Sequence, residues 1–224
     1  MKNYSIAIDG PAGAGKSTIA RKFAQKLGFT YIDTGAMYRA ITLYYVDKGM
    51  DCSDAETVCA SLNDIDVDID YIDGEQHVLL NGSDVTGRIR TQEVSDNASK
   101  ISAIKEVREK LVATQQQMAR SKNVVMDGRD IGSVVLPFAD LKLYLTASVD
   151  VRAKRRYQEL KDKGVEADLP TIAKEIEERD WRDMHRENSP LVCVPDAKVV
   201  DTSDMTIDEV TEHCMKLFEA SKQG

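Results

Sequence analysis

The chain has 224 residues, of which 42% are hydrophobic and 30% are charged, and its net charge at pH 7 is −8. This length fits one α/β domain with small insertions, or at most two domains, and it is sufficient to bury a sound core. The acidic balance argues against a general nucleic-acid-binding surface, although a local cluster of arginines can still bind a small anionic ligand.

Cysteine and histidine placement argues against a zinc site. The four cysteines form no C-x-x-C pair and the three histidines are scattered, so we expect reduced thiols in a cytosolic protein. The N-terminus leads directly into the first predicted strand, without a signal peptide, and no apolar run approaches the length of a membrane span. No heptad pattern or long apolar edge calls for a second subunit. We therefore expect a cytoplasmic monomer without a membrane partner.

The most informative segment reads GPAGAGKS at residues 10–17 and fits the pattern G-x-x-x-x-G-K-[ST]. An apolar run at 4–8 predicts a strand before it, and residues 17–27 predict an amphipathic helix after it, which is the setting of a phosphate-binding loop. We expect Lys16 to reach the β- and γ-phosphates of a nucleoside triphosphate and the Ser17 hydroxyl to hold Mg²⁺. The whole loop is expected to contact the nucleotide: Gly10, Pro11, Ala12, Gly13, Ala14, Gly15, Lys16, Ser17 and Thr18.

Strands alternate with helices along the rest of the chain, which predicts a parallel sheet covered on both faces. The later predicted strands are 29–32, 124–126, 141–145 and 197–200, and the predicted helices are 35–48, one from about 149, and 207–221. Ligands of such sheets bind at the carboxyl ends of the strands. The residues expected to converge there are Gly10, Asp33, Asp127 and Thr146.

Two segments depart from this alternation. Residues 65–71 alternate apolar residues with aspartates, and the turn signals Asp73-Gly74 and Asn81-Gly82 flank an apolar run at 78–80, which predicts a small antiparallel insertion. The aspartates lack the glycine and terminal glutamate of an EF-hand loop, which favours a solvated strand face over calcium binding. The segment 91–120 has helical spacing and forms one long helix, or two helices around Ser102.

Charged residues gather in three further places. The turn Asp127-Gly128-Arg129-Asp130 follows an apolar strand, and a carboxylate at that position contacts hydrated Mg²⁺ in P-loop enzymes, so Asp127 joins Ser17 as a metal candidate. Helical spacing places Arg152, Arg155 and Arg156 on one face, and Arg179, Arg182, Asp183 and Arg186 in one stripe. Solvated surface charge and a simple helix ion pair are the alternatives. Several arginines beside one phosphate loop suggest phosphoryl transfer to a phosphorylated acceptor, because guanidinium groups match phosphate oxygens in pairs.

Five motifs, in order, resemble the bacterial cytidylate kinase family, the CMP/dCMP kinases among the P-loop nucleoside monophosphate kinases. They are IDGPAGAGKS at 8–17, DTGAMYR at 33–39, RTQEV at 90–94, DGRDIG at 127–132 and RDWRD at 179–183. The resemblance implies a P-loop NTPase-type α/β fold of three layers with a five-stranded parallel sheet, a small antiparallel insertion and a short lid. It implies a core of 1–33, 89–148 and 166–224, a monophosphate-binding region of 34–88 with the insertion at about 63–88, and a lid of 149–165.

The resemblance also implies an activity: direct in-line transfer of the ATP γ-phosphoryl group to CMP or dCMP with Mg²⁺, giving ADP with CDP or dCDP. The implied catalytic residues are Lys16, Arg129, Arg152, Arg155 and Arg156, of which the last three belong to the lid. The implied substrate contacts are Thr34 and Arg39 on the CMP side, Arg129 and Arg186 with Arg39 on its phosphate, Asp130, Ser99 and Arg108 on the base, and Arg179 and Asp183 on the ribose.

The base contacts predict a preference for CMP over UMP. An ionised Asp130 accepts a hydrogen bond from the cytosine amino group, and Arg108 donates to its ring acceptors, whereas uracil would set like groups against both. Each buried polar group left unpaired costs about 1–3 kcal/mol.

Three alternatives remain open at this stage. The first is another small-acceptor P-loop kinase, such as a UMP/CMP, adenylate or shikimate kinase, although DGRD stands where an adenylate kinase would have D-G-x-P-R. The second is a P-loop hydrolase or switch protein. The third is an interaction domain without enzymatic activity that docks through the insertion at 63–88.

Overall fold

The computed structural model describes residues 3–72 and 74–222, so Asp73 of the expected Asp73-Gly74 turn lies outside the described residues. The chain divides into two compact units. The first unit comprises Met1–Tyr31 with Ser121–Gly224, and the second comprises Ile32–Arg120.

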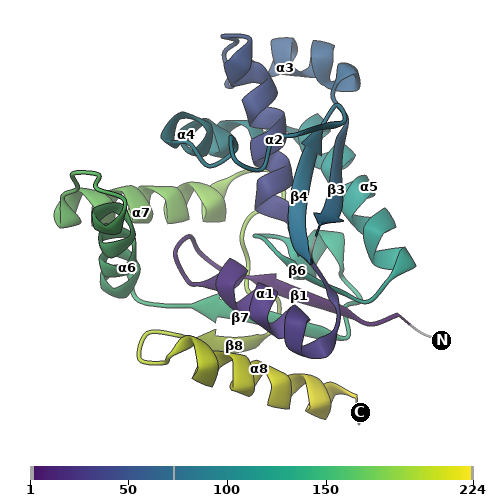
Figure 1. Cartoon of the computed structure of the whole chain (residues 1–224), viewed down its shortest axis with the longest axis vertical. Helices are drawn as coiled ribbons and strands as arrows, with labels where there is room; N and C mark the ends of the chain where they lie inside the picture. Colours follow the sequence, from purple (N-terminus) through teal and green to yellow (C-terminus); the bar gives the residue numbers. More distant parts are fainter. Residues whose placement is uncertain (1–2, 73, 223–224) are drawn as a thin grey trace. The chain divides into compact units, whose positions relative to one another are not determined.

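The first unit is built on a parallel sheet (Figure 1). Its strands are β1 (Ser5–Asp9), β6 (Val124–Asp127), β7 (Leu141–Thr146), β8 (Lys198–Asp201) and, at the edge, β2 (Thr30–Asp33), which begins in this unit. Its helices are α1 (Lys16–Leu27), α6 (Val149–Asp162), α7 (Leu169–His185), α8 (Ile207–Ser221) and a short π-helical turn, Ile131–Val135.

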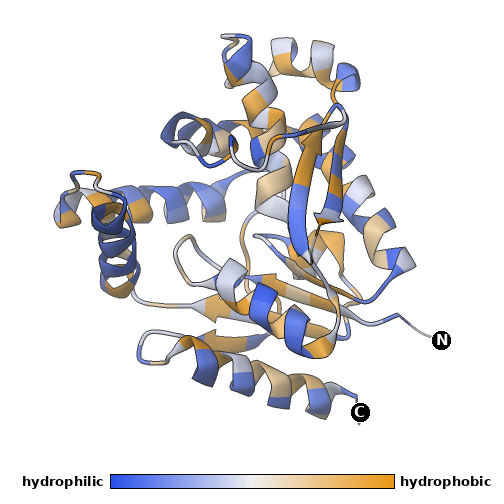
Figure 2. Cartoon of the chain, in the orientation of Figure 1, coloured by the Kyte–Doolittle hydropathy of each residue, from blue (hydrophilic) through white to orange (hydrophobic). Residues whose placement is uncertain are grey.

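The strand order is β2-β6-β1-β7-β8, and β1 pairs in parallel with both β6 and β7. Ile6 faces Val125 and Leu141 in this register, and all three are buried because the central strands have apolar residues at nearly every position. Figure 2 shows these strands as the apolar part of the unit. The predicted five-stranded parallel sheet is confirmed, and its strands begin within two residues of the predicted positions.

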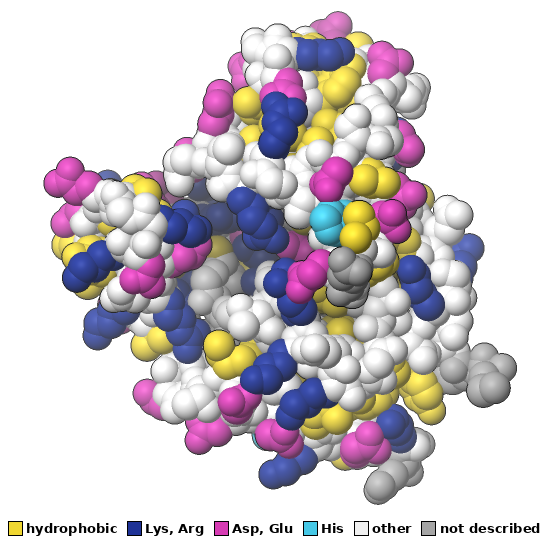
Figure 3. Space-filling view, viewed as in Figure 1, with side chains coloured by type: hydrophobic (Ala, Val, Ile, Leu, Met, Phe, Trp, Pro, Cys, Tyr) yellow, Lys and Arg dark blue, Asp and Glu magenta, His cyan; other side chains and the backbone are white. Residues whose placement is uncertain are grey.

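Helices α1 and α8 pack against each other and against this sheet. Phe218 of α8 is fully buried and makes edge-to-face contacts with Phe23 and Phe29, which anchors the last helix to the first. On the outer surface, Lys22 pairs with Asp208, and basic and acidic side chains are interspersed over the lower part of the view in Figure 3. This closing helix spans the residues that its sequence pattern predicts, 207–221.

Helices α6 and α7 form a hairpin with a small core of its own. Ala153 of α6 packs against Ile172 and Ile176 of α7, and the Ser148 and Asp168 side chains cap the two helices by accepting N–H groups in their first turns. The predicted lid, 149–165, comprises α6 and the turn that follows it. Its role as a lid remains a prediction.

The second unit combines helices with the antiparallel insertion. Its elements are α2 (Thr34–Asp47), α3 (Ala55–Ser61), a 3₁₀ turn (Leu62–Asp64), β3 (Val67–Ile72), β4 (Glu75–Leu80), β5 (Ser83–Asp84), α4 (Gln92–Ile101) and α5 (Lys105–Ser121). The three strands form the expected antiparallel sheet in the order β3-β4-β5. Asp66, Asp68 and Asp70 are exposed, whereas Val67 is buried against this unit.

The segment 91–120 forms two helices, separated at Ser102, which was one of the two predicted arrangements. Helix α4 packs on α2, so the compact units group residues 89–120 with 32–88, whereas the sequence-based division placed them in the core. Packing explains this difference, and the functional division into core, monophosphate-binding region and lid remains a prediction. No helix within residues 3–72 and 74–222 is long and apolar enough to cross a membrane.

Candidate functional site

The loop between β1 and α1 has the backbone of an anion-binding turn. Gly13 and Gly15 adopt positive φ values of 76° and 82°, a region that glycine occupies without steric cost. A Cβ atom on Gly10 would lie 1.9 Å from the Leu145 carbonyl oxygen, so only glycine lets the loop pass this close to β7. Gly15 is the N-cap residue of α1 and has no side chain to satisfy the first N–H groups of the helix, which leaves them for an anion.

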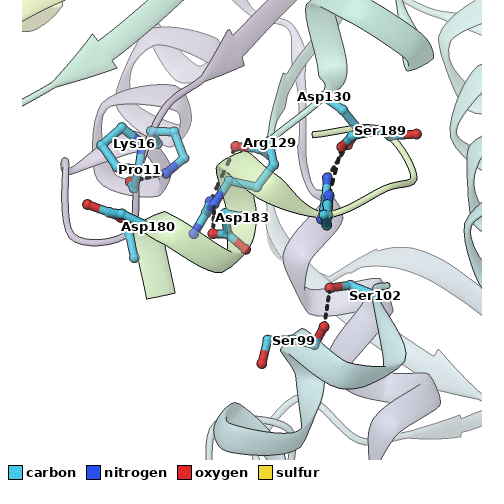
Figure 4. A network of polar contacts seen from close by, with 12 residues as sticks. Pro11, Lys16, Ser99, Ser102, Arg129, Asp130, Asp180, Asp183 and Ser189 are labelled. Atoms are coloured by element: carbon cyan, nitrogen blue, oxygen red, sulfur yellow. Dashed lines mark hydrogen bonds and ion pairs between the residues drawn. The ribbon is translucent and has the colours of Figure 1, made fainter. Parts of the chain in front are cut away.

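Lys16, the first residue of α1, turns its side chain back over the loop. Its Nζ donates a hydrogen bond to the Pro11 carbonyl oxygen at 2.7 Å, and the residue is only 6% exposed (Figure 4). Burial, and next the positive charge of Arg129, lower the pKa of Lys16. Two cations therefore stand close together on this side of the sheet, and phosphate groups would relieve their repulsion.

Ser17 and Asp127, the two metal candidates, are in direct contact. The Ser17 hydroxyl donates to Asp127 Oδ2 at 2.8 Å, and the Tyr31 hydroxyl donates to Oδ1 at 2.8 Å. Tyr31 therefore orients a carboxylate that is 3% exposed at the end of β6. A hydroxyl and a carboxylate held side by side are ligands that Mg²⁺ prefers.

Arg129, two residues beyond Asp127, is paired with Asp183 of α7. Its Nε lies 2.7 Å from Asp183 Oδ2 (Figure 4). Burial alone would raise the pKa of Asp183, but Arg129, Arg179 and Arg186 together hold that pKa below its usual value. Two arginines of the predicted stripe on α7, Arg179 and Arg186, therefore lie near the carboxylate of its third member, Asp183. The fourth, Arg182, is exposed.

Asp130 lies beside Arg186, just past the C-terminal end of α7. Arg186 Nη2 is 3.7 Å from Asp130 Oδ1, and its Nε donates to the Ser189 carbonyl oxygen at 2.7 Å. Both side chains are nearly buried. The first unit thus brings together all the acceptor-side residues that the sequence predicts within it: Arg129, Asp130, Arg179, Asp183 and Arg186.

Asp9 was missed by the sequence analysis, although it is the aspartate that directly precedes the phosphate loop. Its Oδ1 accepts the Ile131 N–H at 2.8 Å and its Oδ2 accepts the Gly132 N–H at 2.7 Å. Burial raises the pKa of Asp9 to about 6 against the opposing effect of these two bonds. A polar residue at the end of an otherwise apolar strand was the available signal.

The three arginines of α6 contact different parts of the unit. Arg152 is buried beneath the phosphate loop and donates to the Ala12 carbonyl oxygen at 3.0 Å. Arg155 donates to the Thr202 carbonyl oxygen at 2.6 Å, and Arg156 pairs with Glu159 on its own helix at 3.0 Å. The shared helical face therefore does not aim all three guanidinium groups at one point, because each takes a nearby acceptor.

A cavity of about 330 Å³ opens beside the start of α1. It is lined by Ala14, Gly15, Thr18, Ile19, Arg155, Thr202, Met205, Thr206, Ile207 and Val210. The sequence analysis missed the part of this wall that precedes α8, and the only signal there was a polar loop after the last strand.

In the second unit, the start of α2 holds two predicted residues. Thr34 is its first residue and is buried, and Asp33 caps the helix by accepting the Ala36 N–H at 2.9 Å while pairing with Arg90 at 2.8 Å. A Cβ atom on Gly35 would lie 3.4 Å from an Arg39 terminal nitrogen. The absence of a side chain at Gly35 therefore gives the Arg39 guanidinium room beside the helix start.

The remaining predicted residues lie on α4 and α5. Arg108 is 3% exposed, donates to the Ser102 carbonyl oxygen at 2.9 Å and stacks over the Tyr38 ring at 5.3 Å. The Ser99 hydroxyl donates to the Asp96 carbonyl oxygen at 3.3 Å, within its own helix. The second unit therefore has a fixed arginine and a serine hydroxyl near the break between α4 and α5.

Known proteins resemble this chain over nearly its whole length. The family model described as cytidylate kinase matches residues 6–220. A cytidylate kinase of Caldicellulosiruptor saccharolyticus is 52% identical over 218 residues, which cover 97% of this chain and 96% of that protein. A cytidylate kinase of Lactobacillus johnsonii is 47% identical over 224 residues, covering 99% and 97%.

The chain belongs to the cytidylate kinase family. Among solved structures, a gluconokinase from Sinorhizobium meliloti has a TM-score of 0.50 at 13% identity, covering 97% of this chain and 92% of the other, which supports the P-loop kinase fold alone.

Membership of the cytidylate kinase family decides between the alternatives left open by the sequence. The protein is an enzyme and a nucleoside monophosphate kinase, so the readings as a P-loop hydrolase or as a docking module are set aside. The predicted family is confirmed over nearly the whole chain. The roles of individual residues remain predictions.

Proposed function

We propose that this protein transfers the γ-phosphoryl group of ATP to CMP or dCMP, giving ADP with CDP or dCDP. The observation that carries the proposal is the pair of fixed cations in the first unit: Lys16 Nζ lies 2.7 Å from the Pro11 carbonyl oxygen of the phosphate loop, and Arg129 Nε lies 2.7 Å from Asp183 Oδ2 (Figure 4). One cation belongs to the donor loop and the other to the arginine–aspartate cluster of α7. The donor phosphate and the acceptor phosphate are both negatively charged, so a cation beside each one allows them to approach for phosphoryl transfer.

The donor would bind at the phosphate loop. The Lys16 ammonium would exchange the Pro11 carbonyl oxygen for phosphate oxygens, while the N–H groups at the start of α1 approach the same phosphates. The cavity beside α1 is next to this loop and offers space for the adenine and ribose. Arg155 forms part of its wall, which supports the predicted contact of Arg155 with ATP.

Ser17 and Asp127 fit Mg²⁺, because their oxygens are adjacent and the metal site needs only oxygen ligands. No group of three or more His, Cys, Asp or Glu residues within 3–72 and 74–222 could hold a metal by itself. The two residues would therefore share the ion with phosphate oxygens and water. Bound there, Mg²⁺ neutralises charge on the phosphates during transfer.

The acceptor phosphate would be held by Arg129 and Arg186. Asp183 pairs with Nε of Arg129, and Nη1 donates to the Gly128 carbonyl oxygen at 3.3 Å, so the direction of the guanidinium is fixed. Arg179 and Asp183 would contact the ribose. The second unit would supply Thr34 and Arg39 for the monophosphate side and Ser99 and Arg108 for the base.

Transfer would proceed in line, without a covalent intermediate. An oxygen of the acceptor phosphate is already a competent nucleophile, so no general base is needed. The side chains contribute by positioning the two substrates and by neutralising charge on the transferring group. Closure of the lid over ATP would exclude water and suppress hydrolysis.

The test is a coupled assay of ADP formation with CMP, dCMP, UMP, AMP and GMP as acceptors. We expect turnover with CMP and dCMP, with UMP a poorer substrate because Asp130 meets its O4 oxygen. Equal turnover of UMP and CMP would contradict the base-reading role of Asp130. Size-exclusion chromatography would test the expected monomer.

A further inference from the structure

One carboxylate joins the end of β1 to the turn that follows Asp130. Asp9 is the last residue of β1, and each of its two oxygens accepts one backbone N–H, from Ile131 at 2.8 Å and from Gly132 at 2.7 Å. It is 5% exposed. The two donors are the residues directly after Asp130, so this carboxylate caps the π-helical turn that begins there.

The surroundings of Asp9 are closely fitted. A Cβ atom on Gly132 would lie 3.3 Å from Asp9 Oδ2 and 3.2 Å from Cδ of Lys142, which is tighter than ordinary side-chain packing. Lys142 is itself held in place by Asp196 at 2.7 Å. Glycine at 132 therefore lets the backbone N–H approach the carboxylate, and an added methyl group would press on both Asp9 and Lys142.

This capping has a consequence for Asp130. Because Asp9 satisfies the first N–H groups of the turn, the Asp130 carboxylate is not required as their cap and can be directed at a ligand. The same two bonds fix the backbone immediately after Asp130. The backbone next to Asp130 is thus held by a residue of another strand, and the Asp130 carboxylate itself lies 3.7 Å from Arg186 Nη2.

We propose that Asp9 is a positioning residue for base recognition: by holding the N–H groups of Ile131 and Gly132, it fixes Asp130 where it discriminates cytosine from uracil. The inference rests on the proposed function and extends it to a residue that contacts no substrate. An ionised carboxylate accepts both N–H groups, whereas an asparagine amide accepts one and turns its own donor toward the other. The substitution Asp9→Asn therefore displaces the turn without removing Asp130.

The experiment compares Asp9→Asn with the matched control Asp140→Asn. Asp140 accepts the Ser5 N–H at 2.8 Å, at the opposite end of β1, so the control makes the same substitution at a carboxylate remote from Asp130. The ratio of kcat/KM for CMP to kcat/KM for UMP is measured at pH 8. ATP is kept saturating, so that a change in ATP affinity does not alter the ratio. We expect this ratio to fall by about tenfold or more in Asp9→Asn. It should stay within about twofold of wild type in Asp140→Asn.

A second variant tests the inference in case Asp9→Asn does not fold. Gly132→Ala keeps both hydrogen-bonding groups but forces Asp9 and the turn apart, so it should lower the CMP-to-UMP ratio in the same direction. Equal losses with CMP and UMP in both Asp9→Asn and Gly132→Ala, or a shift no greater than in Asp140→Asn, would overturn the inference. If Asp9→Asn does not fold, Gly132→Ala decides alone. Wild-type protein that phosphorylates neither CMP nor dCMP would instead overturn the proposed function.

Discussion

Arg152 and Asp180 form a buried ion pair, in which Nη1 of the arginine lies 2.6 Å from Oδ2 of the aspartate. The same guanidinium donates to the Ala12 carbonyl oxygen in the phosphate loop and to the Ala147 carbonyl oxygen before α6. Asp180 Oδ1 is buried without a hydrogen-bond partner in the described part of the chain. The Arg152–Asp180 ion pair therefore connects the phosphate loop, α6 and α7. The buried charge of Arg152 is balanced through one short contact with Asp180.

Replacing Asp180 with asparagine should destabilise the fold strongly. The substitution removes the carboxylate that pairs with a guanidinium that is 4% exposed, and an uncompensated buried charge typically costs about 3 kcal/mol or more. We expect urea denaturation to give a free energy of unfolding lower by about 3 kcal/mol.

A control on the same helix separates burial from charge. Glu178 lies 3.9 Å from Lys174 on the exposed side of α7, so Glu178→Gln should change the free energy of unfolding by less than about 0.5 kcal/mol. Should Asp180→Asn prove as mild as Glu178→Gln, the buried pair would not be a connection that the fold depends on.

Lys16→Ala should abolish most of the turnover with CMP. The ammonium is the cation of the donor loop, and removing a preorganised charge at a transferring phosphoryl group lowers kcat by about 10²–10³-fold. Stopped-time assays with ATP and CMP measure the effect. Lys22→Ala, which removes a solvent-facing lysine two turns further along α1, is the control and should retain near wild-type turnover. A loss of less than about tenfold in Lys16→Ala would contradict the role of Lys16.

The metal requirement can be tested at Ser17. Its hydroxyl, 2.8 Å from Asp127, is the group that we assign to Mg²⁺, so Ser17→Ala should raise the Mg²⁺ concentration needed for half-maximal turnover by about tenfold or more. Ser17→Thr keeps the hydroxyl and should need about as much Mg²⁺ as wild type. Removal of Mg²⁺ with EDTA should stop turnover in all three proteins. An unchanged Mg²⁺ dependence in Ser17→Ala would refute the assignment.

The sequence was most informative where function requires a local pattern. The phosphate loop at 10–17 and the Asp127 carboxylate at the end of β6 could be placed from their flanking apolar runs, and the structure brings Ser17 and Asp127 into contact as those runs indicate. The helix 207–221 was also read to the residue, because its apolar positions and polar ends are unambiguous.

Contacts between residues distant in sequence were not predictable in this way. Asp9 finds its two donors 122 and 123 residues further along the chain, and no local periodicity encodes that approach. Asp180 was passed over because it lies between the members of the α7 stripe, and its partner belongs to α6. The helical face shared by Arg152 and Arg155 also gave no warning that their side chains reach different carbonyl groups.

Asp9 should make a pH-dependent contribution to stability. Burial raises its pKa to about 6 from 3.8, with Asp130 acting in the same direction and with Lys16 and the N–H groups of Ile131 and Gly132 opposing. The unfolded chain ionises near 3.8 and the folded chain only near 6, so the unfolded state binds fewer protons between these values. The stabilising contribution is therefore complete below pH 3.8 and is lost as the pH rises to about 6, amounting to about 3 kcal/mol for two pK units.

Asp9→Asn lacks this titration, so the free energy of unfolding of wild type relative to Asp9→Asn should decline between pH 4 and about 6.5 and then level off. Urea denaturation of both proteins across this range measures the difference, in which the titrations of carboxylates that do not interact with Asp9 cancel. Asp140→Asn, compared with wild type in the same way, reports any general effect of losing an aspartate that accepts a backbone N–H of this sheet. A difference that instead grows in favour of wild type as the pH rises would mean that the two N–H groups outweigh burial, with the Asp9 pKa lowered rather than raised.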